Sequence, residues 1–353
     1  MKFIHTADIH LGSALTSRFP KEIADERKAA VRNTFKKMVE YAKKEGVSAI
    51  LLCGDVFDSD TPLKKDKDFF YGVVRNNPDL DFLYLRGNHD RSGVETEDPP
   101  QNLYRFSENW TSRSYGNVTV SGADFSDGNA LSLYSSLSLQ KETVNVVALH
   151  GQISEEAGKD LVYLKKLRGK NVDYLALGHI HKPEQGKLDD RGVFVYSGCP
   201  EGRGMDETGS HGFFLLDVED KVTATFVPFA ERTVWEKDAD ISGCADSYAA
   251  YRKVKEQVRF EKNDLYRINL VGETDAENDR FAPDVEKYLS EECYFVSVKD
   301  KTKRTVNADA FRNDKTLRGE FVRGVLGNAN LSEEDKAAVF SYGLKALQGE
   351  TDL

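Results

Sequence analysis

The chain has 353 residues, of which 39% are hydrophobic and 31% charged; this composition excludes a largely disordered chain and provides for a sizeable core. Its length favours one large domain followed by a smaller one. The net charge of -10 argues against unaided binding of a long polyanion, because lysine and arginine supply most of the non-specific affinity for phosphate.

We expect a cytoplasmic protein. The N-terminus shows no charged-then-apolar leader, and no stretch approaches the roughly 18 apolar residues of a membrane span. The four cysteines form no CxxC pair, which argues against a zinc ribbon or a redox motif. We expect all four to be reduced thiols, with Cys53 in the core.

Short apolar runs in the first half of the chain repeatedly end in clusters of Asp, Asn, His and Gly. In chain order, these clusters are Asp8-Ile9-His10, Gly54-Asp55, Gly87-Asn88-His89-Asp90, His150-Gly151 and Gly178-His179-Ile180-His181. Continuous apolar runs are typical of strands that are buried on both faces, and helix-compatible stretches such as 23–44 separate them. We therefore predict an α/β architecture in which the strand ends assemble one site.

Further strands are predicted at 193–196, 213–218 and 222–227, and we place a domain boundary near residue 235. The predicted domains are thus 1–235 and 236–353. In the second domain the pattern predicts helices at 247–258, 282–289, 317–326 and 332–348, with strands at 265–271 and 294–298. This is a small α+β domain without a catalytic signature.

Five of the seven histidines stand inside the strand-end clusters: His10, His89, His150, His179 and His181. A single histidine at a strand end is more often structural. Together with Asp8, Asp55 and Asn88 at equivalent junctions, however, the set predicts a metal site. Asp8 and His10 are two residues apart on an extended segment, so both side chains can face the same way and chelate, and His179 and His181 repeat this spacing.

The donor types predict the chemistry. Carboxylates, an amide oxygen and imidazoles suit manganese, iron or zinc, and no thiolate demands a softer metal. Asp55 is the natural bridging ligand. Two cations about 4 Å apart can hold a bridging hydroxide near neutral pH and bind the oxygens of a phosphoryl group. The residues therefore predict phosphoester hydrolysis.

These clusters resemble the five signature motifs of the calcineurin-like metallophosphoesterases. Four stretches are similar in sequence to the SbcD and YhaO-like DNA repair exonucleases: Thr6–Gly12, Gly54–Asp58, Gly178–Pro183 and Tyr196–Gly204. The resemblance implies a fold of two central β-sheets flanked by helices. It also places the second domain where the family has its DNA-capping domain.

The resemblance further implies two divalent metal ions, with Mn²⁺ expected and Fe²⁺ or Zn²⁺ as alternatives. One ion would be held by Asp8, His10, Asp55 and His181, and the other by Asp55, Asn88, His150 and His179. His89 would be the acid that protonates the leaving oxygen, a role suited to an imidazole; the alternative is a hydrogen-bonding prop for the Asn88 loop. Asp58 stands where archaeal and eukaryotic relatives often carry a histidine, and we expect it to orient His89 or another site residue.

Three interpretations of the function remain open. The resemblance implies a DNA-end exonuclease or endonuclease that works in DNA repair with an SMC-like, coiled-coil ATPase of the SbcC type. A phosphodiesterase or phosphatase for nucleotides or other small phosphate esters is the alternative, because the metal motifs do not distinguish substrates. A non-catalytic scaffold is disfavoured, since every motif keeps its ligand residues.

Two surface features have two interpretations each. The basic residues Lys165, Lys166, Arg168 and Lys170, and the run Lys299, Lys301, Lys303 and Arg304, either contact DNA or form solvated surface. The apolar residues Phe69, Phe70, Val73 and Val74 on a predicted helix either pack in the core or support a homodimer.

Overall fold

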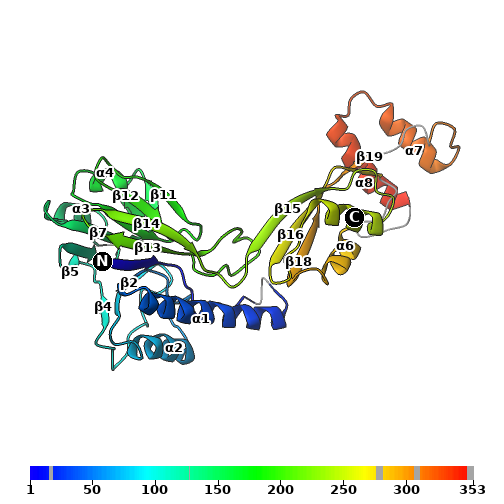
Figure 1. Cartoon of the computed structure of the whole chain (residues 1–353). Helices are drawn as coiled ribbons and strands as arrows, with labels where there is room; N and C mark the ends of the chain where they lie inside the picture. Colours follow the sequence, from blue (N-terminus) through cyan, green and yellow to red (C-terminus); the bar gives the residue numbers. More distant parts are fainter. Residues whose placement is uncertain (16–18, 127, 276–280, 306–310, 348–353) are drawn as a thin grey trace. The chain divides into compact units, whose positions relative to one another are not determined.

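The computed structural model describes residues 1–15, 19–126, 128–275, 281–305 and 311–347. The chain divides into two compact units, Met1–Thr233 and Val234–Leu353 (Figure 1). The first unit contains two six-stranded sheets whose inner faces pack together.

The first sheet combines four parallel strands with an antiparallel pair at one edge. Its strands, in spatial order, are β14 (Val222–Pro228), β13 (Gly212–Val218), β1 (Lys2–Thr6), β2 (Val47–Cys53), β3 (Asp81–Leu85) and β4 (Leu103–Arg105). Strands β1 to β4 run parallel, and β13 lies antiparallel to β1. The carboxyl ends of β1, β2 and β3 therefore lie at the same edge of the sheet.

The second sheet has the same plan, with antiparallel strands at both edges. Its strands, in spatial order, are β11 (Glu184–Lys187), β12 (Val193–Tyr196), β10 (Tyr174–Gly178), β7 (Val144–His150), β6 (Val118–Gly122) and β5 (Thr111–Tyr115). Strands β6, β7, β10 and β12 run parallel. The short strands β8 (Gln152–Ser154) and β9 (Leu161–Tyr163) pair beside this sheet.

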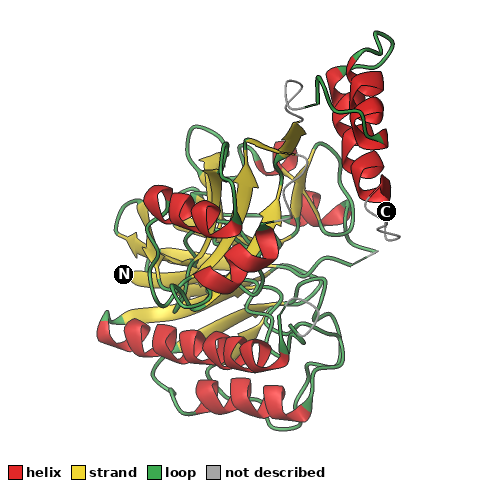
Figure 2. Ribbon diagram, turned by 90° about the vertical axis from the view of Figure 1, so that its right-hand side faces the viewer, coloured by secondary structure: helices red, strands yellow, loops and turns green. Residues whose placement is uncertain are grey.

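Helices cover the outer faces of both sheets. The first sheet is covered by α1 (Lys21–Lys44) and α2 (Lys64–Arg75), which lie side by side (Figure 1 and Figure 2). Apolar residues of α1 such as Phe35 and Met38 recur at helical spacing and are fully buried against β1 to β3. Residues around α3 (Ser132–Ser136) and α4 (Leu164–Leu167) cover the second sheet. The predicted pair of central sheets flanked by helices is thus confirmed.

The second unit is built around three parallel strands joined by helices. Its elements are β15 (Val234–Asp240), α5 (Ser247–Gln257), β16 (Leu265–Val271), β17 (Glu273–Asp275), α6 (Ala282–Leu289), β18 (Phe295–Asp300), β19 (Lys303–Thr305), α7 (Leu317–Leu326) and α8 (Glu333–Leu347). The main sheet has the order β15, β16, β18, with α5 and α6 packed on it, and β17 pairs with β19. The helices α7 and α8 share a separate small core.

Several residues named from the sequence take their places in this fold. Phe70 and Val74 of α2 are fully buried in the core, whereas Phe69 and Val73 are half-buried against it. Cys53 is a core residue, and all four cysteines are buried thiols. Among the described residues, no helix combines the length and the apolar character that crossing a membrane requires.

Candidate metal centre

The five strand-end segments meet at one edge of the two packed sheets. Three of them lie at the carboxyl ends of β1, β2 and β3 in the first sheet, and the other two lie at the carboxyl ends of β7 and β10 in the second sheet. The structure brings together all eight residues predicted for the site, which are Asp8, His10, Asp55, Asn88, His89, His150, His179 and His181.

Three residues form what we call the first cluster: Asp8, His10 and His181. Each can offer one donor atom, and these atoms lie within 4.8 Å of one another. The Nε2 atoms of His10 and His181 face each other at 3.2 Å. The main-chain N–H of His179 donates to both carboxylate oxygens of Asp8, at 3.0 Å each, which fixes that side chain.

The second cluster consists of Asn88, His150 and His179. The side-chain oxygen of Asn88 lies 2.9 Å from His179 Nδ1 and 3.1 Å from His150 Nε2. Asp55 stands between the clusters, because its Oδ2 atom lies 3.4 Å from His150 Nε2 and 3.8 Å from His10 Nε2. One oxygen therefore faces both clusters, which is the arrangement that a ligand shared by two cations needs.

The outer nitrogen of three imidazoles is held by an oxygen acceptor. Nδ1 of His150 lies 2.8 Å from the Cys53 carbonyl oxygen. Nδ1 of His10 lies 2.8 Å from Asp58, and Nδ1 of His181 lies 2.7 Å from Glu207. Each Nδ1 is thus turned outward toward an oxygen, and each Nε2 faces the centre, where a metal ion would displace any proton that it carries. The donor set therefore fits divalent metal ions.

The electrostatics agree with this fit. Burial lowers the pKa of His10 to about 4, so its imidazole is neutral and able to act as a ligand. Burial also raises the pKa of Asp8 to about 6. For His150, burial is outweighed by the Asp55 carboxylate, which raises the pKa to about 9, and His150 in turn keeps the pKa of Asp55 below its usual range against burial. Buried carboxylates beside imidazoles are groups that a cation would stabilise.

The backbone of the site is strained. Asp8, His10, Asp55 and His179 all have positive φ, at 54°, 52°, 51° and 98°. Non-glycine residues rarely adopt this region, and such conformations persist only where the surrounding structure imposes them. Clustering of four at one site is typical of a functional centre.

His89 differs from the rest of the set because its side chain is exposed. Its main-chain N–H donates to Asp55 Oδ1 at 2.8 Å, and its ring stands edge-on to His10 with 5.0 Å between the ring centroids. The main-chain hydrogen bond from residue 89 to Asp55 does not depend on the side chain at that position. The imidazole of His89 lies at the surface of the site, where a substrate can reach it.

A model of the calcineurin-like phosphoesterase family matches residues 1–183, which is more than half of the 353-residue chain. The chain belongs to the calcineurin-like phosphoesterase family. Members of this family use divalent metal ions, and the protein is accordingly a metallophosphoesterase.

Curated relatives of this family align at low identity. The uncharacterized metallophosphoesterase YhaO of Bacillus subtilis is 28% identical over 275 residues, covering 72% of this chain and 67% of that protein. The DNA double-strand break repair protein Mre11 of Sulfolobus acidocaldarius is 23% identical over 354 residues, covering 92% of this chain and 91% of that protein. The SbcD component of the nuclease SbcCD of Rhodobacter capsulatus is 35% identical over 94 residues, covering 26% of this chain and 22% of that protein.

The sequence did not reveal two residues that support this phosphoesterase site, Arg203 and Glu207. Both are buried, and Glu207 accepts from His181 while Arg203 contacts Glu207 and Asp58. Arg203 stands at the end of the stretch Tyr196–Gly204 that carries the family likeness, and no spacing in the sequence ties Glu207 to His181. Asp58 Oδ1 lies 2.8 Å from His10 Nδ1, and His10, Asp58 and His89 together offer donor atoms within 4.8 Å of one another.

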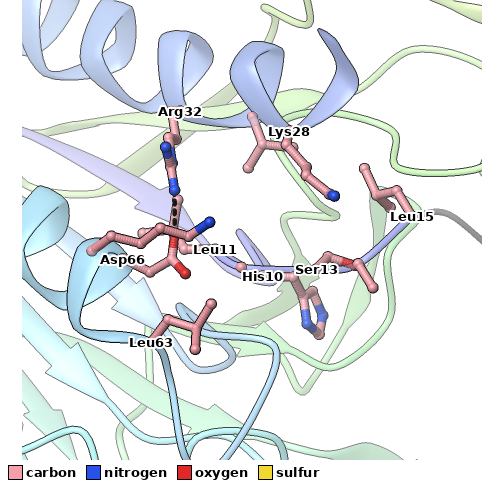
Figure 3. A pocket seen from close by; sticks show the side chains of 12 residues that line it. His10, Leu11, Ser13, Leu15, Lys28, Arg32, Leu63 and Asp66 are labelled. Carbon is pink, nitrogen blue, oxygen red and sulfur yellow. Dashed lines mark hydrogen bonds and ion pairs between the residues drawn. The ribbon is translucent and has the colours of Figure 1, made fainter. Parts of the chain in front are cut away.

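A cavity of about 230 Å³ lies beside the segment that follows His10. Figure 3 shows the ion pair of Arg32 and Asp66 on one side of this space and Lys28 and Leu15 on the other. The His10 ring projects from the other side of the segment, toward the clusters (Figure 3). The cavity therefore lies behind the loop that carries His10 in the phosphoesterase domain.

Proposed function

We propose that the protein is a metal-dependent phosphodiesterase that hydrolyses phosphodiester bonds at DNA ends, as an exonuclease or endonuclease in DNA repair. The observation that carries this proposal is the length of the likeness to the Mre11 repair protein, which covers 92% of this chain and therefore extends into the second unit. A relative that shared only the catalytic fold would not be expected to align there.

The proposed ligand sets follow the geometry of the clusters. One divalent ion, with Mn²⁺ as the expected metal, would be held by Asp8, His10, Asp55 and His181, and a second by Asp55, Asn88, His150 and His179. When bound, two such cations lower the pKa of a water molecule to near neutrality and neutralise charge on the phosphoryl oxygens.

The protein's own residues then have distinct tasks. The oxygens beside Nδ1 orient His10, His150 and His181 so that Nε2 faces the proposed metal ions, and the His179 N–H holds the Asp8 carboxylate in place. His89 is the proposed acid, which donates a proton to the leaving oxygen from its exposed imidazole. The support for this role is that its main chain is anchored on Asp55 and its ring lies against His10.

The net charge of -10 requires the DNA to be held by local groups or by a partner. Exposed lysines are available in both units, including Lys165 and Lys166 of α4 and Lys299, Lys301 and Lys303 near β18 and β19; the side chain of Arg304 lies outside the described residues. We propose the second unit as a capping domain for DNA and an SMC-like, coiled-coil ATPase as the partner.

The deciding experiment compares two substrates. End-labelled linear DNA and bis-p-nitrophenyl phosphate are incubated with Mn²⁺ and either the wild-type protein or His89→Ala. We expect wild type to cleave both. Removing a general acid costs about 100- to 10,000-fold in rate, so His89→Ala should lose activity while its Mn²⁺ affinity, measured by calorimetry, stays unchanged.

The outcomes separate the functions. Hydrolysis of the diester alone, with DNA untouched even after addition of a coiled-coil ATPase partner, would leave the small phosphate ester as the substrate. Full activity of His89→Ala toward both substrates would remove the acid role from His89. Absence of all hydrolysis in a protein that binds two Mn²⁺ ions would leave only a scaffold.

A further inference from the structure

Arg203 joins two carboxylates, each of which faces one histidine of the first cluster. Its side chain is only 5% exposed. Nη1 lies 3.0 Å from Asp58 Oδ1, and Nη2 lies 3.0 Å from Glu207 Oε1. The main-chain N–H of Arg203 also donates to the second oxygen of Glu207. A single guanidinium therefore fixes the positions of both carboxylates.

These two carboxylates in turn hold the two histidines of the first cluster. Asp58 Oδ1 lies 2.8 Å from His10 Nδ1, and Glu207 Oε1 lies 2.7 Å from His181 Nδ1. Nη2 of Arg203 also lies 3.1 Å from His181 Nδ1. His10 follows β1 of the first sheet, whereas His181 follows β10 of the second sheet. Arg203 thus links two imidazoles that the two sheets deliver separately, and it sets their Nε2 atoms 3.2 Å apart.

The second cluster is supported differently. His150 Nδ1 is held by the main-chain carbonyl of Cys53, and His179 contacts the neutral side chain of Asn88. Neither of these supports involves Arg203. A change at Arg203 should therefore affect one of the two clusters and leave the other intact.

We propose that Arg203 is a positioning residue that sets the affinity and geometry of the first metal site only. The role suits arginine, whose planar fork can donate to two carboxylates in fixed directions, whereas a lysine ammonium is a point charge on a flexible stem. Without the fork, the carboxylates of Asp58 and Glu207 lose their shared donor, and the imidazoles that they hold can turn. Outer partners of this kind typically contribute 10- to 100-fold to metal affinity.

Arg27 provides a matched control. It is 1% exposed and pairs with Glu201 at 2.7 Å, so its removal also breaks a buried ion pair. Glu201 accepts from Arg27, Thr34 and the main chain of Glu231, all of which lie outside the two clusters. Arg27 also donates to the main-chain carbonyl of Gly202, the residue before Arg203. Arg27→Met should therefore reproduce the cost of losing a buried arginine and its contact with this loop, while the Arg203 guanidinium keeps its contacts with Asp58 and Glu207.

The test titrates Mn²⁺ into the metal-free full chain by calorimetry and records the visible spectrum of the Co²⁺-loaded protein, for wild type, Arg203→Met, Arg203→Lys and Arg27→Met. We expect two Mn²⁺ sites in wild type and in Arg27→Met. In Arg203→Met one of the two dissociation constants should rise about tenfold, the other should stay unchanged, and the Co²⁺ spectrum should shift. Arg203→Lys should resemble Arg203→Met, because it keeps the charge and loses the fork.

Each other result would overturn the proposal. Unchanged constants and spectrum in Arg203→Met would leave Arg203 a structural residue, and a tighter site would mean that its charge opposes the metal. Wild-type Mn²⁺ affinity in Arg203→Lys would show that the charge alone is needed and not the positioning. An equal loss of Mn²⁺ affinity in Arg27→Met would show that the effect comes from lower stability of the fold. The inference rests on the metal binding in the proposed function and not on DNA cleavage, so a wild type that binds no Mn²⁺ would refute that function, whereas these outcomes refute only the role of Arg203.

Discussion

Replacing Gly54 by alanine tests whether the site depends on close packing of its backbone. Gly54 has a φ of +90°, and a Cβ atom added there would lie 2.1 Å from Nδ1 and 2.6 Å from Cγ of His150. That ring is buried and hydrogen-bonded to the Cys53 carbonyl. The new methyl group must therefore push the imidazole away from its acceptor and from the second cluster.

Three costs add up in Gly54→Ala. The left-handed backbone costs about 1–2 kcal/mol for an alanine. Overpacking a filled interior costs about 1–3 kcal/mol. Loss of the hydrogen bond of His150 costs about 0.5–1.5 kcal/mol. We therefore expect the free energy of unfolding to fall by about 2–6 kcal/mol, after allowing for the stiffer unfolded chain of the variant.

Gly46→Ala isolates the backbone contribution. Gly46 has a φ of +67°, and a Cβ atom added there would meet nothing within 4 Å. We expect this variant to lose only about 1 kcal/mol and to bind metal normally. The assay is urea denaturation with chelator present, followed by Mn²⁺ titration. Equal losses in the two variants, or normal Mn²⁺ binding by Gly54→Ala, would show that the contact between Gly54 and His150 does not shape the site.

Three further changes test stability and its pH dependence. Asn102→Ala removes a buried amide that donates to three main-chain carbonyls at 2.9–3.0 Å, so denaturation should show a loss of about 2–3 kcal/mol. In His5, burial lowers the pKa of the imidazole from 6.5 to about 3. Between these two pH values only the unfolded chain takes up the proton, so acid favours unfolding. As the pH falls through this window, the wild type should therefore lose roughly 4 kcal/mol more stability than His5→Gln. In Asp8, burial raises the pKa of the carboxyl group from 3.8 to about 6. Its ionisation therefore costs the metal-free fold roughly 3 kcal/mol of stability as the pH rises between these values. In chelator at pH 8, Asp8→Asn should be more stable than the wild type, and addition of Mn²⁺ should reverse this order.

The parts of the fold that the sequence predicted are those with a strong local pattern. The strands at 193–196 and 265–271 lie where their apolar runs predicted them. The helices at 282–289 and 317–326 also lie where their helical pattern predicted them. Short edge strands such as β5, β8 and β11 were not predicted, because three to five residues with exposed faces carry no apolar run. Nor did the sequence predict that β15, β16 and β18 pair in parallel, which depends on the crossover helices.

The residues that contact the site from a distance were also beyond prediction. Glu207 is 26 residues from the His181 that it holds, and Arg203 is 145 residues from Asp58. A buried carboxylate or guanidinium looks in sequence like any surface charge, since only the tertiary structure removes its water. Metal-ligand residue types, in contrast, recur at the ends of apolar runs, and this repetition made the site visible.

The strained backbone explains why the site needs support beyond its predicted ligands. Asp8, His10, Asp55 and His179 hold conformations that cost about 1–3 kcal/mol each, and no local pattern favours them. The cost is offset by main-chain hydrogen bonds that tie the loops together, such as those from Asp8 to Gly54 and from His10 to Asp55. The main-chain N–H of His179, which follows β10 of the second sheet, also donates to the Asp8 carboxylate of the first sheet, so the arrangement is complete only once both sheets have packed. The ligand geometry is therefore a property of the complete first unit, and a fragment that holds all the motifs of one sheet should not bind metal.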